Sequence, residues 1–388
     1  MKQLFLIIFF SIFFFTCREE YVSPVSSPNT GYLVVEGGIN SGPGNTTIKL
    51  SRTTPLAEGR KNIETGATVT VLDENGNSFP LLESSVHGDY VANGLNLNPT
   101  LKYKLRIVAN QKEYLSDYVA VNVNPPIDTI SWSRASDGVH IFANTHDPQN
   151  KAKYFQWDYI ATWEFHSEYI PSLKYDLNDP YFVVYFDPIN WWRDDSSLYK
   201  CWQTDTSRYI ILGSTVKYAV DSISNPLTVI EPASWKLSVL YSINVRQYTY
   251  TKDGYEFLQK MKKNSEQLGS VFDAQPSELQ GNIHCTSNPN EVVIGYVSSC
   301  DIREKRAYIN LPGWNYKSDC YLLAENNDTA FIRINNYYAN GIPHILPVYF
   351  LTLSLPPPNG FILTFTAADK FCVDCRLRGT SSKPAYWP

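Results

Sequence analysis

Short hydrophobic runs that alternate with polar residues fill the first part of the chain, and the clearest lie at residues 32–35, 47–50, 67–71 and 103–107. Apolar side chains at every second position line one face of a strand, so this pattern predicts an antiparallel β-sandwich. Asn75-Gly76 separates two such runs and predicts a hairpin, because both residues tolerate positive φ. We therefore expect residues 31–124 to form an Ig-like or fibronectin-like β-sandwich.

Pro125-Pro126 interrupts this pattern, because proline cannot donate to a strand ladder and restricts the residue before it. We place a domain boundary here and expect residues 125–388 to form a larger, β-rich domain. The segments predicted to be strands are enriched in β-branched and aromatic residues. They include residues 140–144, 154–165, 182–186, 209–220, 237–250 and 291–297.

Residues 253–268 follow a different period. Tyr255, Leu258, Met261 and Leu268 recur at helical steps, and lysines and glutamates fall between them. Asp253 precedes this run and Gly269 follows it, and these residue types suit the two ends of a helix. The pattern predicts one amphipathic helix packed against a sheet.

The first residues of the chain resemble a bacterial lipoprotein leader. Residues 4–15 are apolar and too few to span a bilayer, and Lys2 precedes them. The end of this run, Phe14-Phe15-Thr16-Cys17, resembles a lipobox, in which the cysteine is acylated and becomes the mature N-terminus. Thr16 departs from the usual Gly or Ala, so secretory cleavage or a short membrane anchor are alternatives. We predict a signal peptide over residues 1–16, lipidation at Cys17 and a flexible tether over residues 17–30.

The tether and the composition bear on location and partners. Arg18-Glu19-Glu20 resembles the export signal of Bacteroidetes lipoproteins that reach the outside of the outer membrane; an ordinary charged tether is the alternative. The net charge of −5 comes from interspersed charges of both signs and offers no electrostatic footprint for nucleic acid. We therefore expect a surface-exposed protein without a nucleic-acid partner.

Six cysteines besides Cys17 lie in the C-terminal half. An even number in an exported chain predicts disulfides, because thiols are not kept reduced outside the cytoplasm. We expect three bridges, and the sequence does not choose among the possible pairings. The C-x-x-C spacing of the last two also resembles a redox or zinc motif, but its place near the chain end and the lack of a second pair favour structural bridges. The six are Cys201, Cys285, Cys300, Cys320, Cys372 and Cys375.

Motifs for catalysis and metal binding are weak. Ser214-x-x-Lys217 matches a serine–lysine pair, yet positions three apart on a strand point to opposite faces. His140, His146 and Asp147 are metal-ligand types with unspecific spacing. Adjacent carboxylates at residues 194–195 could act as paired acids, but they diverge on an extended chain. We predict no catalytic residues, no metal and no cofactor.

Aromatic residues with an arginine form the candidate binding site. Trp191, Trp192 and Arg193, together with Tyr181 and Tyr185, are predicted to bind a ligand or a partner, because Trp, Tyr and Arg dominate interface hot spots. Packing in the core is the alternative.

Several segments carry a resemblance to a known family. They are Tyr32-Leu33-Val34-Val35-Glu36-Gly37, Gly66-Ala67-Thr68-Val69, residues 241–248, Gln275-Pro276-Ser277, Gly281-Asn282-Ile283, and the closing Cys372-Val373-Asp374-Cys375-Arg376 with Lys383-Pro384-Ala385-Tyr386-Trp387. Together they resemble a Bacteroidetes outer-membrane lipoprotein family labelled domain of unknown function 4249. The resemblance implies a lipid-anchored protein that accompanies a TonB-dependent receptor.

From the resemblance we expect a non-catalytic accessory or binding subunit of a TonB-dependent uptake system for an unidentified nutrient, anchored in the outer membrane by its N-terminal lipid. One alternative is a cell-surface hydrolase of glycan or peptide, which predicts a cleft with perturbed carboxylates. Another is an adhesion or envelope-scaffold lipoprotein.

Overall fold

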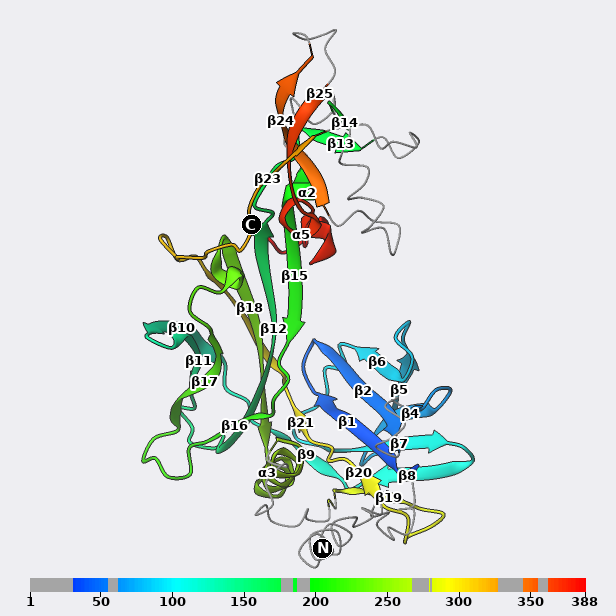
Figure 1. Cartoon of the computed structure of the whole chain (residues 1–388). Helices are drawn as coiled ribbons and strands as arrows, with labels where there is room; N and C mark the ends of the chain where they lie inside the picture. Colours follow the sequence, from blue (N-terminus) through cyan, green and yellow to red (C-terminus); the bar gives the residue numbers. More distant parts are fainter. Residues whose placement is uncertain are drawn as a thin grey trace, which may run out of the picture.

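Strands dominate this computed structural model, which describes residues 31–54, 62–175, 184–186, 196–266, 279, 281–326, 345–354 and 362–388 (Figure 1). The prediction of a mainly β fold with one amphipathic helix is therefore confirmed. An N-terminal sheet lies beside the lower part of a taller central sheet, and a smaller C-terminal lobe extends from the far end of the central sheet (Figure 1).

The N-terminal sheet closes on itself. Its strands pair in the order β7-β4-β5-β6-β2-β1-β21-β9, where β21 (Ser299–Cys300) comes from much later in the chain, and β9 pairs again with β7. The sheet is barrel-like rather than strictly a sandwich, because alternation specifies a buried face and leaves open whether the sheet edges meet. The strands from this part of the chain are β1 (Leu33–Asn40), β2 (Asn45–Arg52), β3 (Asn62–Ile63), β4 (Thr68–Asp73), β5 (Ser78–Glu83), β6 (Asp89–Asn93), β7 (Lys102–Ala109), β8 (Lys112–Ser116) and β9 (Val119–Asn122).

The predicted hairpin forms between β4 and β5. Asp73 accepts hydrogen bonds from the backbone N–H groups of Asn75 and Asn77, at 2.9 and 2.8 Å. Gly76 has a φ of 90°, the left-handed conformation that glycine adopts without strain. Asn-Gly therefore marks the turn for the reason that the sequence pattern indicated.

Three short strands return to the N-terminal sheet from the segment that the sequence analysis placed in the larger domain. They are β19 (Ile283–Cys285), β20 (Val293–Ile294) and β21 (Ser299–Cys300). β19 pairs with β8, β20 pairs with β1, and β21 lies between β1 and β9 with both pairings parallel. The side-chain amide of Asn282 bonds both the N–H and the carbonyl of Val297, which fixes this return segment.

The central sheet has the order β15-β12-β18-β22, and β16 pairs with the start of β12. A second sheet, β10-β11-β17, packs on its inner face around buried Trp157, Trp163 and Phe165. The prediction of one strand over residues 209–220 is too long, because β16 ends at Ser214. The bounds are β10 (Ile127–Ala135), β11 (Gly138–His146), β12 (Tyr154–His166), β15 (Lys200–Thr206), β16 (Ile211–Ser214), β17 (Ser222–Ile230), β18 (Leu240–Tyr250) and β22 (Arg303–Ile309), with a 3-10 helix η3 (Trp235–Leu237).

The predicted amphipathic helix is α3 (Lys252–Glu266). It buries Tyr255, Phe257 and Leu258 and leaves its lysines and glutamates half-buried or exposed. Gly254 lies against Tyr296, and a Cβ at that position would stand 2.7 Å from the tyrosine ring. The helix lies beneath the central sheet, at the end where β21 enters the N-terminal sheet (Figure 1).

The C-terminal lobe contains the sheet β23-β25-β24 and the pair β13-β14. Two disulfides hold it: Cys320–Cys372 lies within the lobe region, and Cys201–Cys375 joins it to β15. The elements are β13 (Leu173–Tyr175), β14 (Val184–Phe186), α2 (Ser196–Tyr199), β23 (Leu323–Asn326), β24 (Ile345–Leu353), β25 (Ile362–Asp369), α5 (Lys370–Val373) and the 3-10 helix η4 (Cys375–Leu377).

The expectation of three bridges is corrected to two, because Cys285 and Cys300 are free and buried. Cys285 lies on β19 opposite Tyr114, whereas Cys300 lies on β21 between Asn40 and Asn122. Each is enclosed by different neighbours within the closed sheet. Counting cysteines could not reveal that two of them are packed as small apolar side chains.

Among the residues that the structure describes, none belongs to a helix long and apolar enough to cross a membrane.

Candidate functional site

The residues predicted to bind a ligand fall mostly outside the part of the chain that the structure describes. Tyr181, Trp191, Trp192 and Arg193 lie outside it, as do Cys17 and the carboxylates at 194–195. The backbone of Tyr185 lies on β14, opposite Lys174 of β13. The predicted binding role of these residues stays a prediction.

The weak catalytic and metal candidates are engaged elsewhere. His140 pairs with Asp137 at 2.8 Å, and His146 pairs with Asp128 at 2.7 Å. Asp147 is buried and accepts hydrogen bonds from backbone N–H groups in the turn that follows it. Within the described ranges, no three His, Cys, Asp or Glu side chains gather in a way that could hold a metal ion.

Ser214 and Lys217 do not share a strand. Ser214 ends β16, and its hydroxyl accepts a hydrogen bond from the N–H of Val216 at 3.3 Å. Lys217 lies in the turn beyond the strand. The arrangement lacks the helical turn that would place a lysine amine beside a serine nucleophile.

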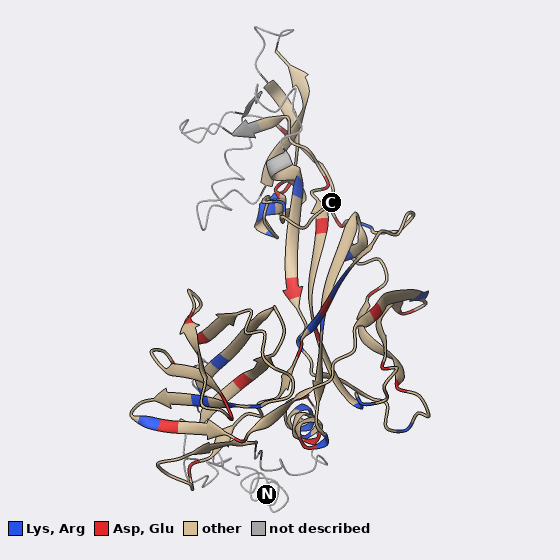
Figure 2. Cartoon of the chain, turned by 180° about the vertical axis from the view of Figure 1, so that it is seen from behind, with Lys and Arg blue, Asp and Glu red and all other residues tan. Residues whose placement is uncertain are grey.

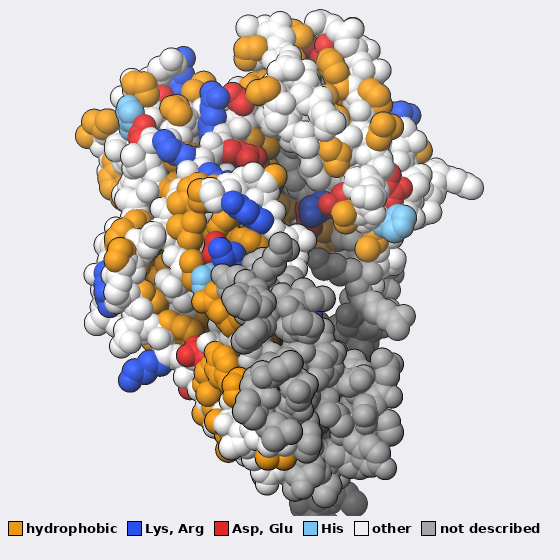
Figure 3. Space-filling model, turned by 90° about the horizontal axis from the view of Figure 1, so that it is seen from above, with side chains coloured by type: hydrophobic (Ala, Val, Ile, Leu, Met, Phe, Trp, Pro, Cys, Tyr) orange, Lys and Arg blue, Asp and Glu red, His pale blue; other side chains and the backbone are white. Residues whose placement is uncertain are grey.

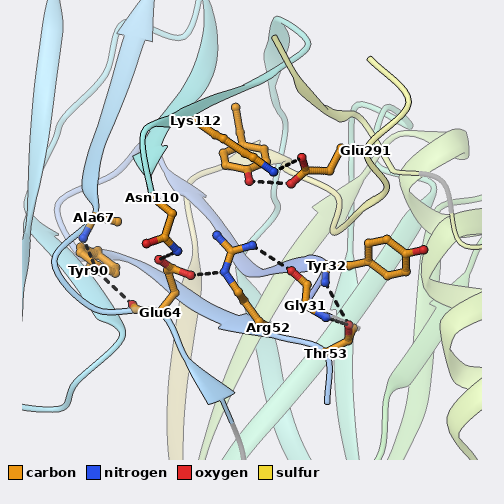
Figure 4. Close-up of polar contacts among 11 residues, drawn as sticks. Gly31, Tyr32, Arg52, Thr53, Glu64, Ala67, Tyr90, Asn110, Lys112 and Glu291 are labelled. Carbon is orange, nitrogen blue, oxygen red and sulfur yellow. Dashed lines mark hydrogen bonds and ion pairs between the residues drawn. The ribbon is translucent and has the colours of Figure 1, made fainter. Parts of the chain in front are cut away.

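A polar cluster holds the first described residues of the chain, and we call it the tether clamp (Figure 4). The Thr53 hydroxyl accepts hydrogen bonds from the N–H groups of Gly31 and Tyr32, both at 3.1 Å. Arg52 donates to the Gly31 carbonyl at 2.8 Å and forms an ion pair with Glu64. Two adjacent residues at the end of β2 therefore hold the point where the predicted tether joins the fold.

The clamp is buried, and its charges are paired. The side chains of Arg52 and Glu64 are only 14% and 7% exposed, and Asn110 donates a hydrogen bond to Glu64 at 2.9 Å. Burial opposes the charge on Arg52, but hydrogen bonds with Glu64 and Tyr114 outweigh burial and raise the pKa of Arg52. Each charge of this buried pair therefore has the other as its partner.

A second ion pair beside the clamp joins β8 to the returning segment (Figure 4). Glu291 accepts from Lys112 at 2.6 Å and from the hydroxyl of Tyr114 at 2.7 Å. Burial works against its charge, yet these two donors hold the pKa of Glu291 below its usual value. Burial and the bond to Glu291 raise the pKa of Tyr114 to about 12. The clamp therefore joins the start of the chain to residues far along it.

The clamp lies at one end of the molecule. The first residues of β1 pair with β20, and Figure 1 places β19 and β20 at the end opposite the C-terminal lobe.

Viewed from the lobe end, hydrophobic side chains gather in a strip beside the part of the surface that is not described (Figure 3). Exposed apolar residues of the lobe include Tyr349, Phe350 and Leu351 on β24. The lobe end therefore exposes apolar side chains.

The outer face of the central sheet is polar. Across β12, β18 and β22, Asp158, Arg246 and Glu304 stand in one row. Arg246 donates two hydrogen bonds to Asp158, at 2.6 and 2.9 Å, and the Tyr248 hydroxyl donates a third at 3.1 Å. Burial, followed by the nearby charge of Asp158, raises the pKa of Tyr248. With three donors on one carboxylate, this row suits holding side chains in place rather than proton transfer.

The end of the chain docks on the same face. The Trp387 indole donates to Glu164 at 2.8 Å, and the Tyr386 hydroxyl bonds Thr162 at 2.9 Å. The Arg306 guanidinium lies 3.7 Å above the ring of Tyr386. The closing Tyr-Trp of the sequence therefore covers part of the central sheet.

Charges are interspersed over the chain, and Figure 2 shows Lys and Arg alternating with Asp and Glu along its ribbons. The stretch Arg303-Glu304-Lys305-Arg306 on β22 is one example.

Sequence reasoning missed the tether clamp, because its members are single residues spread from Gly31 to Glu64. The only signal in the sequence was Arg52, at the end of a strand, and the acidic Glu64 further along the chain.

Comparisons with known proteins identify the family of this chain. The family model described as Domain of unknown function (DUF4249) matches residues 18–306, so the closing segment from Cys372 to Trp387 lies beyond the match. No curated protein matches the chain.

Two solved structures are similar only at low TM-scores. The two fibronectin type III domain segment from chicken tenascin is 11% identical, with a TM-score of 0.16, and the alignment covers 57% of this chain and 91% of that one. The calcium-binding domain CBD12 of CALX1.1 is 9% identical, with a TM-score of 0.15, over 72% of this chain and 99% of that one. Neither similarity bears on the function of this chain.

Proposed function

The chain belongs to the Domain of unknown function (DUF4249) family, and we propose that it is a lipid-anchored, surface-exposed outer-membrane protein that acts by binding rather than catalysis. In this proposal it is an accessory subunit of a TonB-dependent receptor and helps to capture a nutrient. Cys17 carries the lipid, and residues 18–30 form the tether.

The tether clamp is the observation that carries the proposal. Arg52 and Thr53 hold Gly31 and Tyr32 by hydrogen bonds, and Arg52 is itself held by a buried ion pair. A force on the preceding residues would therefore act on this buried ion pair. Residues 18–30 reach at most roughly 45 Å when fully extended. A protein held in this way stays within this distance of the membrane, as a capture subunit beside a receptor requires.

Co-purification tests this proposal. The full chain would carry an affinity tag after Pro388, joined by a flexible spacer because Trp387 is 6% exposed and docked. It would be expressed in its own bacterium, extracted in mild detergent and analysed by mass spectrometry. We expect a TonB-dependent receptor in near-stoichiometric amount.

A Cys17→Ala chain is the matched control. It keeps every described residue but loses the acylated thiol, so we expect it to leave the membrane fraction and to lose the receptor. If the lipidated chain came out alone, or if the Cys17→Ala chain stayed in the membrane, the proposal would fail. Protease applied to intact cells tests surface exposure separately.

A further inference from the structure

A hollow of about 300 Å³ lies where the turn after β15 meets β17, on the side of the central sheet away from the polar face. Its lining includes Leu227 and Ile211 as apolar floor, and Tyr209 and Arg208 at the rim. This volume is at the lower end of the range for ligand pockets, which is roughly 300–1,000 Å³. The hollow therefore suits a small ligand or the end of a longer one.

The turn that forms the rim is held rigidly. The N–H of Ser207 donates to the Tyr159 carbonyl at 3.0 Å, and the Ser207 hydroxyl accepts from the Tyr159 N–H at 3.2 Å. Ile210 is held by the last turn of α3: its N–H donates to Glu266 at 2.6 Å, and its carbonyl accepts from Lys262 at 2.7 Å. Fixed backbone on both sides of the rim reduces the entropy lost on binding.

Tyr209 stands between these two fixed points and is 70% exposed. Its ring contributes little to the core, and its place at the rim of the hollow gives it a flat apolar surface for a ligand. Aromatic rings add binding energy through contact with another ring or with C–H groups at a small cost in side-chain entropy. The placement therefore indicates stacking on a flat ligand.

The polar groups of the hollow carry no net charge. Arg208 pairs with Asp205 at 3.3 Å, which leaves neither charge unmatched, and Thr206, Ser207 and Thr228 supply hydroxyls that can donate and accept. An anionic ligand would require an unmatched cation here, and an apolar ligand would leave the hydroxyls without partners. A sugar ring has the matching chemistry, with hydroxyls around its edge and C–H groups on its faces.

We infer that this hollow binds a neutral saccharide, with Tyr209 stacked on the sugar ring and the Asp205–Arg208 pair bonded to its hydroxyls. The inference deepens the proposed function by naming the class of ligand, and it rests on that function for the source of the saccharide. Binding by the purified protein does not depend on a receptor, so the two proposals fail separately.

Calorimetric titration tests the inference. The neutral probes are maltotriose, cellotriose, xylotriose, mannotriose and triacetylchitotriose, and oligomers of glucuronic and galacturonic acid are the charged probes. Each is titrated into the purified full chain in a zwitterionic detergent without a sugar headgroup. We expect at least one of the neutral probes to bind. Tyr209→Ala should weaken that binding by about tenfold, from the loss of one stacked ring, and Tyr209→Phe should keep it, because the ring remains.

Tyr321→Ala is the matched control, since Tyr321 is 68% exposed and does not line the hollow. It should bind as the unaltered chain does. The inference is overturned if no probe binds at millimolar concentration, or if Tyr209→Ala and Tyr321→Ala bind equally. It is also overturned if only glucuronic or galacturonic acid oligomers bind, because the hollow would then select charge.

Discussion

Gln247 is the residue whose loss should most clearly weaken the junction between the two sheets. It lies fully buried on the inner face of β18 and accepts a hydrogen bond from the Trp157 indole at 2.9 Å. Its amide nitrogen donates to the Pro125 carbonyl at 2.8 Å and to Asn124 at 3.1 Å. One side chain thus fixes the link between the N-terminal sheet and the central sheet.

Gln247→Leu keeps the approximate volume and removes these bonds. It leaves at least two buried groups without a partner, the Trp157 N–H and the Pro125 carbonyl. Each such group costs about 1–3 kcal/mol, so the free energy of unfolding should fall by roughly 2–6 kcal/mol. Leucine cannot recover this loss, because the neighbours that lose their bonds are polar.

Guanidinium unfolding followed by tryptophan fluorescence measures this loss, with both disulfides intact. Gln203→Leu is the control, because the buried amide oxygen of Gln203 has no hydrogen-bond partner, and it should cost less than about 1 kcal/mol. Hydrogen exchange at the backbone N–H groups of Asn124 and Ile127, which flank the two prolines, should also speed up in Gln247→Leu alone. Equal stability of the two variants would refute the reasoning.

Three further predictions concern other parts of the fold. The pKa of Glu291 is lower in the folded chain than in the unfolded chain, so the ionised carboxylate stabilises the fold. This stabilisation is complete above the pKa of the unfolded chain, about 4.3, and is lost as the pH falls through the pKa of the folded chain. Glu291→Gln should therefore melt below the unaltered chain at pH 7, and the difference between the two melting temperatures should shrink as the pH falls below about 4.3. A difference that stays constant over the acidic range would contradict the prediction. Replacing Cys201 and Cys375 together by serine should lower stability by roughly 4–5 kcal/mol in urea, because their bridge closes a separation of 174 residues; Cys285→Ala breaks no bridge and serves as the comparison. Gly281→Ala would place a Cβ 1.6 Å from the Gly295 carbonyl oxygen. It should lower the free energy of unfolding by about 1–3 kcal/mol or more, measured by thermal unfolding. A decrease below about 0.5 kcal/mol would show that the backbone moves to make room for the methyl group.

Patterns within single segments of the sequence correctly predicted several strands, the helix and one turn. Enrichment in β-branched and aromatic residues over residues 154–165 and 237–250 predicted the strands β12 and β18, which bury side chains such as Trp157 and Val245. The helix α3 was predicted from periodicity, with Tyr255 and Leu258 at helical spacing. Asn75-Gly76 marked its turn by the conformation that the two residues tolerate.

Long-range pairings could not be predicted from the sequence. β21 contributes two residues, too few to show a period, and its place between β1 and β9 depends on partners more than 170 residues away. The number of cysteines predicted disulfides, but it could not show that Cys285 and Cys300 remain unpaired. Gly281-Asn282-Ile283 was noticed as part of a resemblance, and its role became clear only from the bonds between Asn282 and Val297.

The candidate sites show the same limit. The tether clamp unites Gly31, Arg52, Thr53 and Glu64, which no spacing rule connects. Tyr209 was the first residue of a segment predicted to be a strand, and nothing in that pattern connected it with Arg208 or with the hollow. The aromatic cluster at 191–193 was the strongest sequence signal for binding, and it lies outside the described residues.

The position of β21 imposes an order of events on a newly made chain. Synthesis proceeds from the N-terminus, so β1 and β9 emerge long before Ser299 and Cys300, and until then the seam that these two residues fill stays open. Unpaired strand edges attract other chains. The first third of the protein must therefore wait as an incomplete ring, and a nascent chain cut short before residue 300 should be a strong substrate for chaperones.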